Sequence, residues 1–295
     1  MITGASGYLA QELIKLLLHK KNEYKITGVV RNSYTNEILN QIDTIQAEDF
    51  FEGGTIAIDI PDIICHLASA RPVHSFNEMA QSAIFTDRIC RYADKNKIEG
   101  LILASSHSIY GNNNIEPWHE GTQISPDTSY AFLKFMAEQS VLKIRENSPK
   151  TRTIALRFSR LIGRGSAMRN NEFIHKFIEL SKKSETIIIC NKNQKFDLIN
   201  VRDAANSIIK VINLKTWPDT LNIGSNKFVN TTEIAKLCIR TVNNSSSKIE
   251  ILDDITNQYK DHLMTSEKAV EILKWAPSIS LEESISELYE CSKIQ

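Results

Sequence analysis

The chain has 295 residues, which is long enough for one large domain or two unequal lobes around a substantial core. Its 35 basic and 35 acidic residues give a formal net charge of zero, so the composition does not favour a nucleic-acid partner or a membrane surface. The longest apolar runs are far shorter than a membrane span, and no signal peptide is predicted. The 5 cysteines are odd in number and form no C-x-x-C pair, which favours reduced thiols in a cytoplasmic protein without disulfides or zinc.

The first ten residues read M-I-T-G-A-S-G-Y-L-A and lead into a run with helical apolar spacing. Gly4 and Gly7 would let the backbone turn tightly after a strand and approach a pyrophosphate, which then lies at the helix N-terminus. Ala10 takes the third position of the glycine pattern and is small enough for close helix–strand packing. Only Met1 and Ile2 precede the turn, whereas strands usually have about five residues. The first strand is therefore expected to be unusually short, or to begin further upstream.

Residues 24–30 predict a second strand, which ends at Arg31. An acid at this position would bind the ribose 2′-hydroxyl of NAD, whereas an arginine accommodates the 2′-phosphate of NADP. Arg31 therefore favours NADP, and a strand-end arginine in solvent is the alternative. Residues 36–60 predict only a weak helix, a third strand near 44–47 and a turn at Gly53-Gly54.

Residues 62–70 predict an apolar strand that ends in small residues, which would allow a flat cofactor to lie close. His66 in this strand is interpreted as a packed core histidine, because no residue at metal-ligand spacing follows it. Arg71 and His74 come in the next loop, where they could meet either a substrate or water.

A long helix is predicted over residues 76–96 and a further strand over 100–106. Strands that alternate with helices at this spacing predict an α/β fold with a parallel, doubly wound sheet. Ligands bind at the carboxyl ends of the strands in such sheets, which is where Ser106 would lie.

Tyr130 and Lys134 are four residues apart in a predicted helix, so their side chains share one face. A phenol holds its proton until about pH 10 and is a poor base near neutrality. An ammonium beside it would stabilise the phenolate and lower its pKa, which makes proton exchange with a substrate hydroxyl feasible. The spacing alone is weak evidence, because a half-buried tyrosine beside a solvated lysine would also show it.

Four motifs together give a stronger signal: T-G-x-x-G-x-x-A at 3–10, H-L-A-S-A at 66–70, S-S-H-S-I-Y-G at 105–111 and Y-A-F-L-K at 130–134. In this order and spacing, the chain resembles an extended short-chain dehydrogenase/reductase of the NAD(P)-dependent sugar epimerase/dehydratase family. Later segments continue the resemblance: 153–158, 197–205, 221–224, 231–234 and 266–277. The resemblance implies a Rossmann domain over 1–165 and a substrate-binding lobe over 166–295 that sends segments back to the first.

The family resemblance also implies roles for individual residues. Tyr130 would be the acid/base that exchanges a proton with a sugar hydroxyl or keto oxygen, Lys134 would lower its pKa and hold the nicotinamide ribose, and Ser106 would bind the same substrate oxygen. The cofactor would be bound by Gly4, Ser6, Gly7, Tyr8, Leu9, Arg31, Asn32, Ser33, Leu67, Ala68, Ser69, Ala104, Tyr130, Lys134 and Phe158. The substrate would be bound by Arg71, Ser106, His107, Ser108, Ser159 and Lys195, and no metal site is expected.

Two departures from the family pattern bear on the reaction. His107 and Ser108 stand where sugar 4,6-dehydratases carry the Asp-Glu pair that eliminates water, so the sequence favours a 4-epimerase or a 4-keto-sugar reductase. Family epimerases mostly keep NAD tightly bound and reductases often use NADPH. Arg31 therefore favours reduction with NADP, and NAD remains possible.

Two further departures concern the substrate. Ser159 stands where many nucleotide-sugar members have a diphosphate-binding asparagine, and Phe196 stands where they have an arginine. The positive charge could come from other cations, unless these only solvate a loop: Arg160, Arg164, Arg169 or Lys195. A nucleoside-diphosphate sugar remains the leading substrate class.

The predicted function is NAD(P)-dependent oxidoreduction at a carbon of a nucleotide-linked sugar in surface polysaccharide biosynthesis, the pathway resting on family analogy. The alternative is a non-catalytic NADP-binding regulatory or scaffold protein on the same fold. Helices 76–96 and 132–147 carry apolar faces that often pair across a dimer axis in this family, so the resemblance implies a homodimer, although burial within one subunit would also explain these faces. Trp118, Trp217 and Trp275 are predicted to be packing residues.

Overall fold

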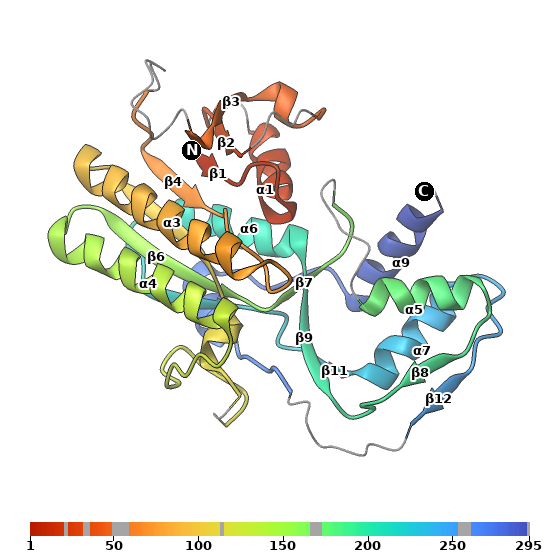
Figure 1. Ribbon diagram of the computed structural model, residues 1–295. Helices are drawn as coiled ribbons and strands as arrows, with labels where there is room; N and C mark the ends of the chain where they lie inside the picture. Colours follow the sequence, from red (N-terminus) through yellow and green to blue (C-terminus); the bar gives the residue numbers. More distant parts are fainter. Residues whose placement is uncertain are drawn as a thin grey trace.

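The structure is a computed structural model, and it describes residues 1–20, 23–31, 36–48, 59–112, 115–165, 173–252 and 261–293. A central sheet of 7 strands runs in the order β10-β6-β5-β4-β1-β2-β3, and every neighbouring pair in it is parallel (Figure 1). Its strands are β1 (Ile2–Thr3), β2 (Thr27–Val30), β3 (Asp43–Gln46), β4 (Ile63–His66), β5 (Gly100–Ser106), β6 (Arg152–Phe158) and β10 (Thr220–Ile223). The predicted doubly wound α/β sheet is thereby confirmed.

Helices cover both faces of the sheet, and alternate residues of β5 show the two layers. Ile102 and Ala104 belong to a buried cluster with the apolar residues of three helices, whereas Leu101 and Leu103 belong to a cluster with two others. The first layer holds α1 (Tyr8–Leu18), α6 (Val201–Ile212) and α8 (Glu267–Leu273). The second holds α3 (Phe76–Asn96) and α4 (Ser129–Asn147), which lie side by side (Figure 1). Burial on both faces explains why the sequence of β5 is almost continuously apolar.

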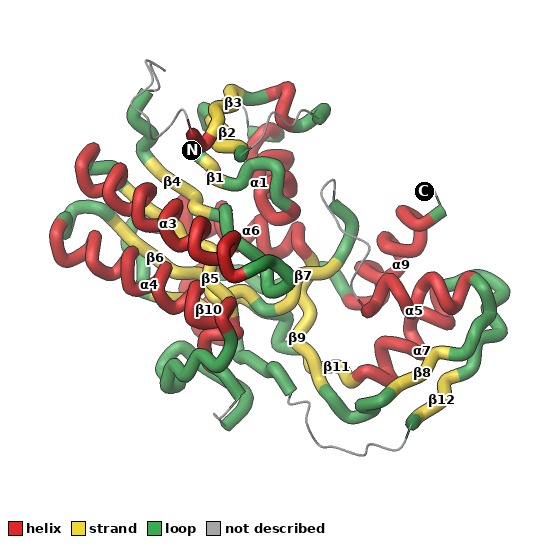
Figure 2. Tube along the Cα trace, in the orientation of Figure 1, coloured by secondary structure: helices red, strands yellow, loops and turns green. Residues whose placement is uncertain are grey.

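A second core lies beside the sheet (Figure 2). It is built from β7 (Arg160–Ile162), β8 (Ile187–Ile189), β9 (Lys195–Asn200), β11 (Phe228–Asn230), β12 (Ile249–Ile251), α5 (Phe173–Lys182), α7 (Thr231–Thr241) and α9 (Leu281–Ser292). The chain crosses between the two cores, because β9 leads into α6 and β10 forms an edge of the large sheet. A boundary near residue 165 stays a prediction.

Some predicted elements differ from those in the structure. The first strand has only 2 residues, but it is hydrogen-bonded on both sides, because Ile2 pairs with Gly28 and with Cys65. The second strand begins at Thr27 instead of residue 24. Where the weak helix was predicted, the described residues hold the 3-10 turn η1 (Leu39–Gln41) and two α-helical residues at 47–48, and the predicted Gly53-Gly54 turn lies outside the described residues.

The three tryptophans are buried, at 1%, 5% and 5% exposure for Trp118, Trp217 and Trp275, so their predicted packing role is confirmed. In the part of the chain that the structure describes, no helix is both long and apolar enough to span a membrane.

Candidate active site

The glycine turn after β1 packs directly on the loop after β4. Gly4 has a positive φ of 66°, and a Cβ there would lie 2.8 Å from the Cα of Ala68, so the position excludes any other residue. Gly7 donates its N–H to the Gly4 carbonyl at 2.7 Å and forms the N-cap of α1 without a capping side chain. Strand order reverses between β1 and β4, and in doubly wound sheets this is where dinucleotides bind. The turn and the bare helix N-terminus fit a pyrophosphate.

His66 stabilises the residues beside this crevice through hydrogen bonds. Its two ring nitrogens lie 2.7 Å from the hydroxyl of Thr3 and 2.9 Å from that of Thr86, and the Ala68 N–H donates to Thr3 at 3.3 Å. Burial, and then the charge of Lys134, lowers the pKa of His66 to about 3. The interpretation of His66 as a packed core histidine is confirmed, and its low pKa keeps the ring neutral at pH 7.

Tyr130, Lys134 and Ser106 come together from two elements. Thr128 caps α4 by accepting from the N–H of Ala131, which places Tyr130 in the first turn and Lys134 one turn later. The Lys134 ammonium lies 5.7 Å from the centre of the Tyr130 ring and donates to the Ala104 carbonyl of β5 at 2.8 Å. Ser106 ends β5, and its hydroxyl faces the Tyr130 phenol.

The pKa of Tyr130 differs from the prediction in the direction of its shift. Burial raises the pKa of Tyr130 to about 12, and the Ser106 hydroxyl works against this rise by bonding to the phenolate. The predicted lowering of the Tyr130 pKa by Lys134 is therefore wrong for this site, because desolvation dominates and the ammonium is turned to the Ala104 carbonyl. Burial also lowers the pKa of Lys134 to about 8, with the charge of Glu138 acting in the opposite direction.

His107 follows Ser106 and lies in an aromatic cluster. Its ring stacks on Trp118 at 6.2 Å and lies 5.7 Å from the ring of His262. Burial first, and then the charge of His262, lowers the pKa of His107 to about 4. Its Nδ1 lies 3.0 Å from the Phe158 carbonyl, which can only accept, so Nδ1 carries the proton and Nε2 is left as an acceptor.

Arg31 lies on the surface directly after β2. Hydrogen bonds to Ser75 lower the pKa of the Glu78 carboxyl. The positive charge of Arg31 adds a smaller lowering. Asn32 and Ser33 lie outside the described residues.

The predicted substrate-binding residues are spread over several elements. Ser108 has a buried hydroxyl without a hydrogen-bond partner among the described residues, while its N–H donates to Ser106. Ser159 is buried and its hydroxyl faces the carboxyl of Asp197. Arg71 donates its backbone N–H to His74 at 3.3 Å, and Lys195 is exposed at the start of β9.

Of the alternative cations, Arg160 lies over the rings of Phe173 and Phe196, at 5.8 and 5.6 Å. Arg164 is exposed after β7, and Arg169 lies outside the described residues.

A buried network beneath Lys134 was not predicted from the sequence motifs. Glu138 forms two hydrogen bonds with Arg157, whose guanidinium also donates to the Tyr110 hydroxyl, and Tyr110 donates to Asn222. The position of Glu138, four residues after Lys134, was the available signal, because that spacing places both side chains on one helix face.

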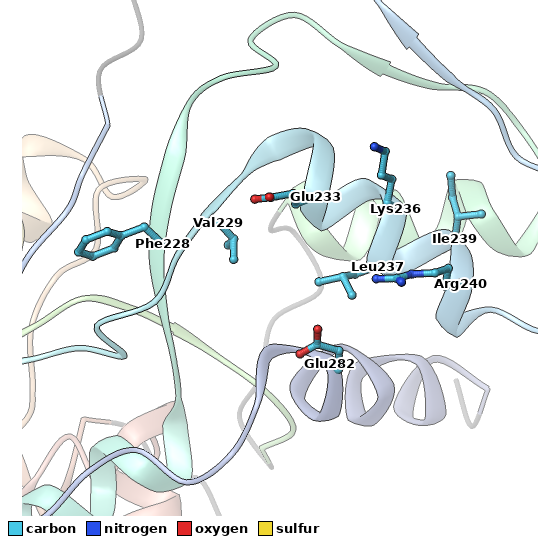
Figure 3. A pocket seen from close by; sticks show the side chains of 8 residues that line it. All are labelled: Phe228, Val229, Glu233, Lys236, Leu237, Ile239, Arg240 and Glu282. Carbon is cyan, nitrogen blue, oxygen red and sulfur yellow. The ribbon is translucent and has the colours of Figure 1, made fainter.

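A cavity of about 540 Å³ lies away from these residues, between β11, α7 and α9 (Figure 3). Its lining includes Val229 and Leu237 as apolar groups and Lys236 and Arg240 as cations, and it contains none of the predicted site residues. Among the described residues there is no group of three side chains suited to hold a metal ion.

The model of one protein family, the NAD dependent epimerase/dehydratase family, matches residues 1–224. The chain belongs to this family. Members therefore supply the comparison for both the fold and the chemistry.

Relatives of known activity span several reactions. The dTDP-4-dehydro-6-deoxyglucose reductase of Escherichia coli is 26% identical, over 98% of this chain and 95% of its own. The UDP-glucose 4-epimerase of Thermotoga maritima, solved with UDP-glucose, has a TM-score of 0.85 at 19% identity and covers 100% of this chain and 99% of its own. The UDP-glucuronic acid 4-epimerase of Bacillus cereus, solved with UDP-glucuronic acid and NAD, has a TM-score of 0.82 at 18% identity, over 99% of this chain and 98% of its own. The two solved structures show the shared fold, and the relatives do not select one reaction.

Proposed function

We propose that the protein catalyses NAD(P)-dependent oxidoreduction at a carbon of a nucleotide-linked sugar, as a 4-keto-sugar reductase or a 4-epimerase. The observation that carries the proposal is the meeting of Tyr130, Lys134 and Ser106 beside the crevice between β1 and β4. A protein that only bound the cofactor would have no physical reason to assemble an acid, a cation and a hydroxyl there.

In the reductive direction, Tyr130 donates its proton to the keto oxygen of the substrate while Ser106 donates a hydrogen bond to the same oxygen. Burial raises the pKa of Tyr130 to about 12, so the phenol is protonated at neutral pH and can act as this acid. Lys134, whose ammonium lies at the Ala104 carbonyl, would hold the nicotinamide ribose. The nicotinamide, when bound, supplies or removes the hydride.

Water elimination is disfavoured by the groups next to Ser106. Elimination needs an acid and a base that reach the substrate. His107 is neutral with its Nδ1 proton held by the Phe158 carbonyl, and Ser108 brings only a hydroxyl. This supports a reductase or an epimerase rather than a dehydratase.

The preference for NADP is part of the proposal and rests on Arg31, which lies on the surface directly after β2. A guanidinium at this position suits the 2′-phosphate by charge and by paired hydrogen bonds. NAD is the alternative cofactor, in keeping with the description of the family.

We also propose a homodimer formed through α3 and α4. Large apolar side chains are exposed on both helices, Phe76 and Ile84 on α3 and Phe132 and Met136 on α4. Neighbouring helices with such side chains give an apolar face of the kind that mediates association. The proposed place of the reaction is cytoplasmic surface polysaccharide biosynthesis, by analogy with the family.

The test is cofactor binding followed by turnover. Purified protein is titrated with NADPH and NADH, its retained cofactor is identified, and a panel of 4-keto nucleotide sugars is assayed with wild type and Tyr130→Phe. Empty protein that binds NADPH and consumes it, with turnover lost by about a hundredfold or more in Tyr130→Phe and binding kept, supports the reductase. Tightly retained NAD moves the proposal to the epimerase. Binding without turnover of any substrate by wild type supports the non-catalytic alternative.

A further inference from the structure

Two buried cations and one buried anion lie together beneath the candidate site. Lys134 and Glu138 are 5% and 3% exposed and lie one turn apart on α4, and Arg157 is buried on β6 beside them. Buried charges require compensation by an opposite charge or by hydrogen bonds. One carboxylate thus has to serve both cations.

The carboxylate is bonded to only one of them. Arg157 donates from Nε to one oxygen of Glu138 at 3.1 Å and from Nη2 to the other at 2.8 Å, in a two-pronged ion pair. Lys134 donates instead to the Ala104 carbonyl, which is neutral. Glu138 therefore acts on Lys134 through the electrostatic effect of its charge and not through a direct hydrogen bond.

The ion pair is fixed from its far side. Arg157 Nη1 donates to the Tyr110 hydroxyl at 2.9 Å, and Tyr110 donates to the Asn222 side chain at 2.7 Å. Asn222 belongs to β10, at the edge of the sheet. The network ties the Glu138 carboxylate to the sheet, so its distance from Lys134 is set by the fold.

The other titratable groups near Lys134 do not replace this charge. Tyr130 on α4 and Tyr110 in η2 (His107–Tyr110) have raised pKa values and are neutral phenols at pH 7. His66 on β4 is held neutral by burial. Arg157 on β6 is itself a cation.

We propose that Glu138 is a positioning residue of the candidate site, whose single carboxylate keeps Lys134 charged at the Ala104 carbonyl while it pairs with Arg157. This inference rests on the proposed function, because a charged Lys134 matters where a cofactor and a phenol depend on it. The carboxylate of Glu138 thereby supports the three residues that the sequence motifs indicate.

The experiment measures NADH affinity by fluorescence over a pH series centred on the Lys134 pKa of about 8. Affinity in wild type should fall as pH rises through this value, because Lys134 loses its charge. In Glu138→Gln the midpoint should move down by about one pH unit, the size expected for a charge one helical turn away. Glu146→Gln, the same change on an exposed part of α4, should keep the wild-type midpoint.

A double variant separates the effect of Glu138 on Lys134 from its ion pair with Arg157. Glu138→Gln leaves Arg157 unpaired and should lower the unfolding temperature, whereas Glu138→Gln combined with Arg157→Met leaves no orphaned charge. The double variant should keep most of the downward shift. A wild-type midpoint in the double variant would overturn the proposal, since Glu138 would then serve Arg157 alone.

Trace acetylation of Lys134, followed by mass spectrometry of the cofactor-free protein over the same pH series, gives the midpoint without any ligand. If wild type binds no NADH, the proposed function fails, and the acetylation midpoints still decide whether Glu138 acts on Lys134.

Discussion

At the scale of single residues, the turn at Gly4 has no room for a side chain. Gly4→Ala would bring a Cβ against the Ala68 backbone and place alanine at a positive φ, so the turn must shift away from the loop after β4. We expect NADH affinity to fall by about tenfold or more, measured by fluorescence titration. Gly121→Ala, where the added Cβ meets only the flexible His119 side chain, is the control and should bind as wild type does. Unchanged affinity in Gly4→Ala would place the cofactor elsewhere.

Arg31 carries the choice between the two dinucleotides. Arg31→Ala should weaken NADPH binding by about tenfold to a hundredfold and leave NADH binding unchanged, because only the former has the 2′-phosphate. Parallel titrations of both cofactors measure the ratio. Arg91→Ala removes another exposed arginine, one paired with Asp87 on α3, and should change neither affinity. If wild type and Arg31→Ala bind NADPH with the same affinity, the proposed NADP preference is contradicted.

The sequence could predict which residues meet at the site but not their charge states. The spacing of Tyr130 and Lys134 on a helix, and the position of Ser106 at a strand end, follow from local rules. The raised pKa of Tyr130 depends on how deeply packing from other elements buries the phenol. The orientation of Lys134 towards Ala104 likewise depends on the neighbouring strand β5.

At the scale of elements, α4 begins at a side-chain cap just before Tyr130. Thr128→Ala removes the hydroxyl that accepts from the Ala131 N–H at 3.1 Å, and should lower the free energy of unfolding by about 1 kcal/mol. Urea denaturation measures the change. Thr128→Ser keeps the acceptor and should recover most of the loss, while Ser140→Ala in the middle of the helix should change the stability by less than about 0.5 kcal/mol. A loss of the same size in Thr128→Ser would show that the cap is not the cause.

Long elements with a strong apolar pattern were predictable to the residue, as α3 and β5 illustrate. β1 shows the opposite case, because its 2 residues carry too little pattern and are held by strands on both sides. Among its described residues, segment 36–60 holds the 3-10 turn η1, the edge strand β3 and two helical residues at 47–48, and such short elements depend on tertiary contacts.

At the scale of the whole molecule, Asp197 joins the second core to the segment that leaves the large sheet. Its carboxylate accepts from the N–H and the hydroxyl of Ser225, at 2.8 and 2.5 Å, just after β10. Burial raises the pKa of Asp197 from 3.8 to about 6, with the hydrogen bonds from Ser225 acting against it. The folded state holds the proton of the Asp197 carboxyl more tightly than the unfolded chain does. Protonated Asp197 therefore stabilises the fold at low pH, and this contribution to the free energy of unfolding is lost as pH rises through 6.

Asp197→Asn should therefore stabilise the protein at neutral and higher pH, by about 1 to 3 kcal/mol, since the amide keeps an acceptor oxygen and loses the buried charge. The gain should shrink as pH is lowered below 6. Urea denaturation of wild type and variant at one pH on each side of this value measures it. A gain that does not depend on pH would exclude the buried charge as its source.

The relation between the two cores could be predicted from the family resemblance but not from local pattern. Nothing in the composition of α6 or β10 distinguishes an element that returns to the large sheet from one that stays in the second core. Their placement follows from packing, since the apolar residues of α6 complete the layer that α1 begins.

That shared layer has a consequence for the order in which the chain is made. The ribosome releases α1 early, yet the α6 residues that cover its apolar face, such as Ala204 and Ile208, emerge only after two thirds of the chain has been synthesised. Leu273 of α8 and Trp275 join the same cluster later still. The nascent N-terminal half therefore waits with an uncovered apolar face, and such transiently exposed surface favours aggregation until the later helices have been synthesised.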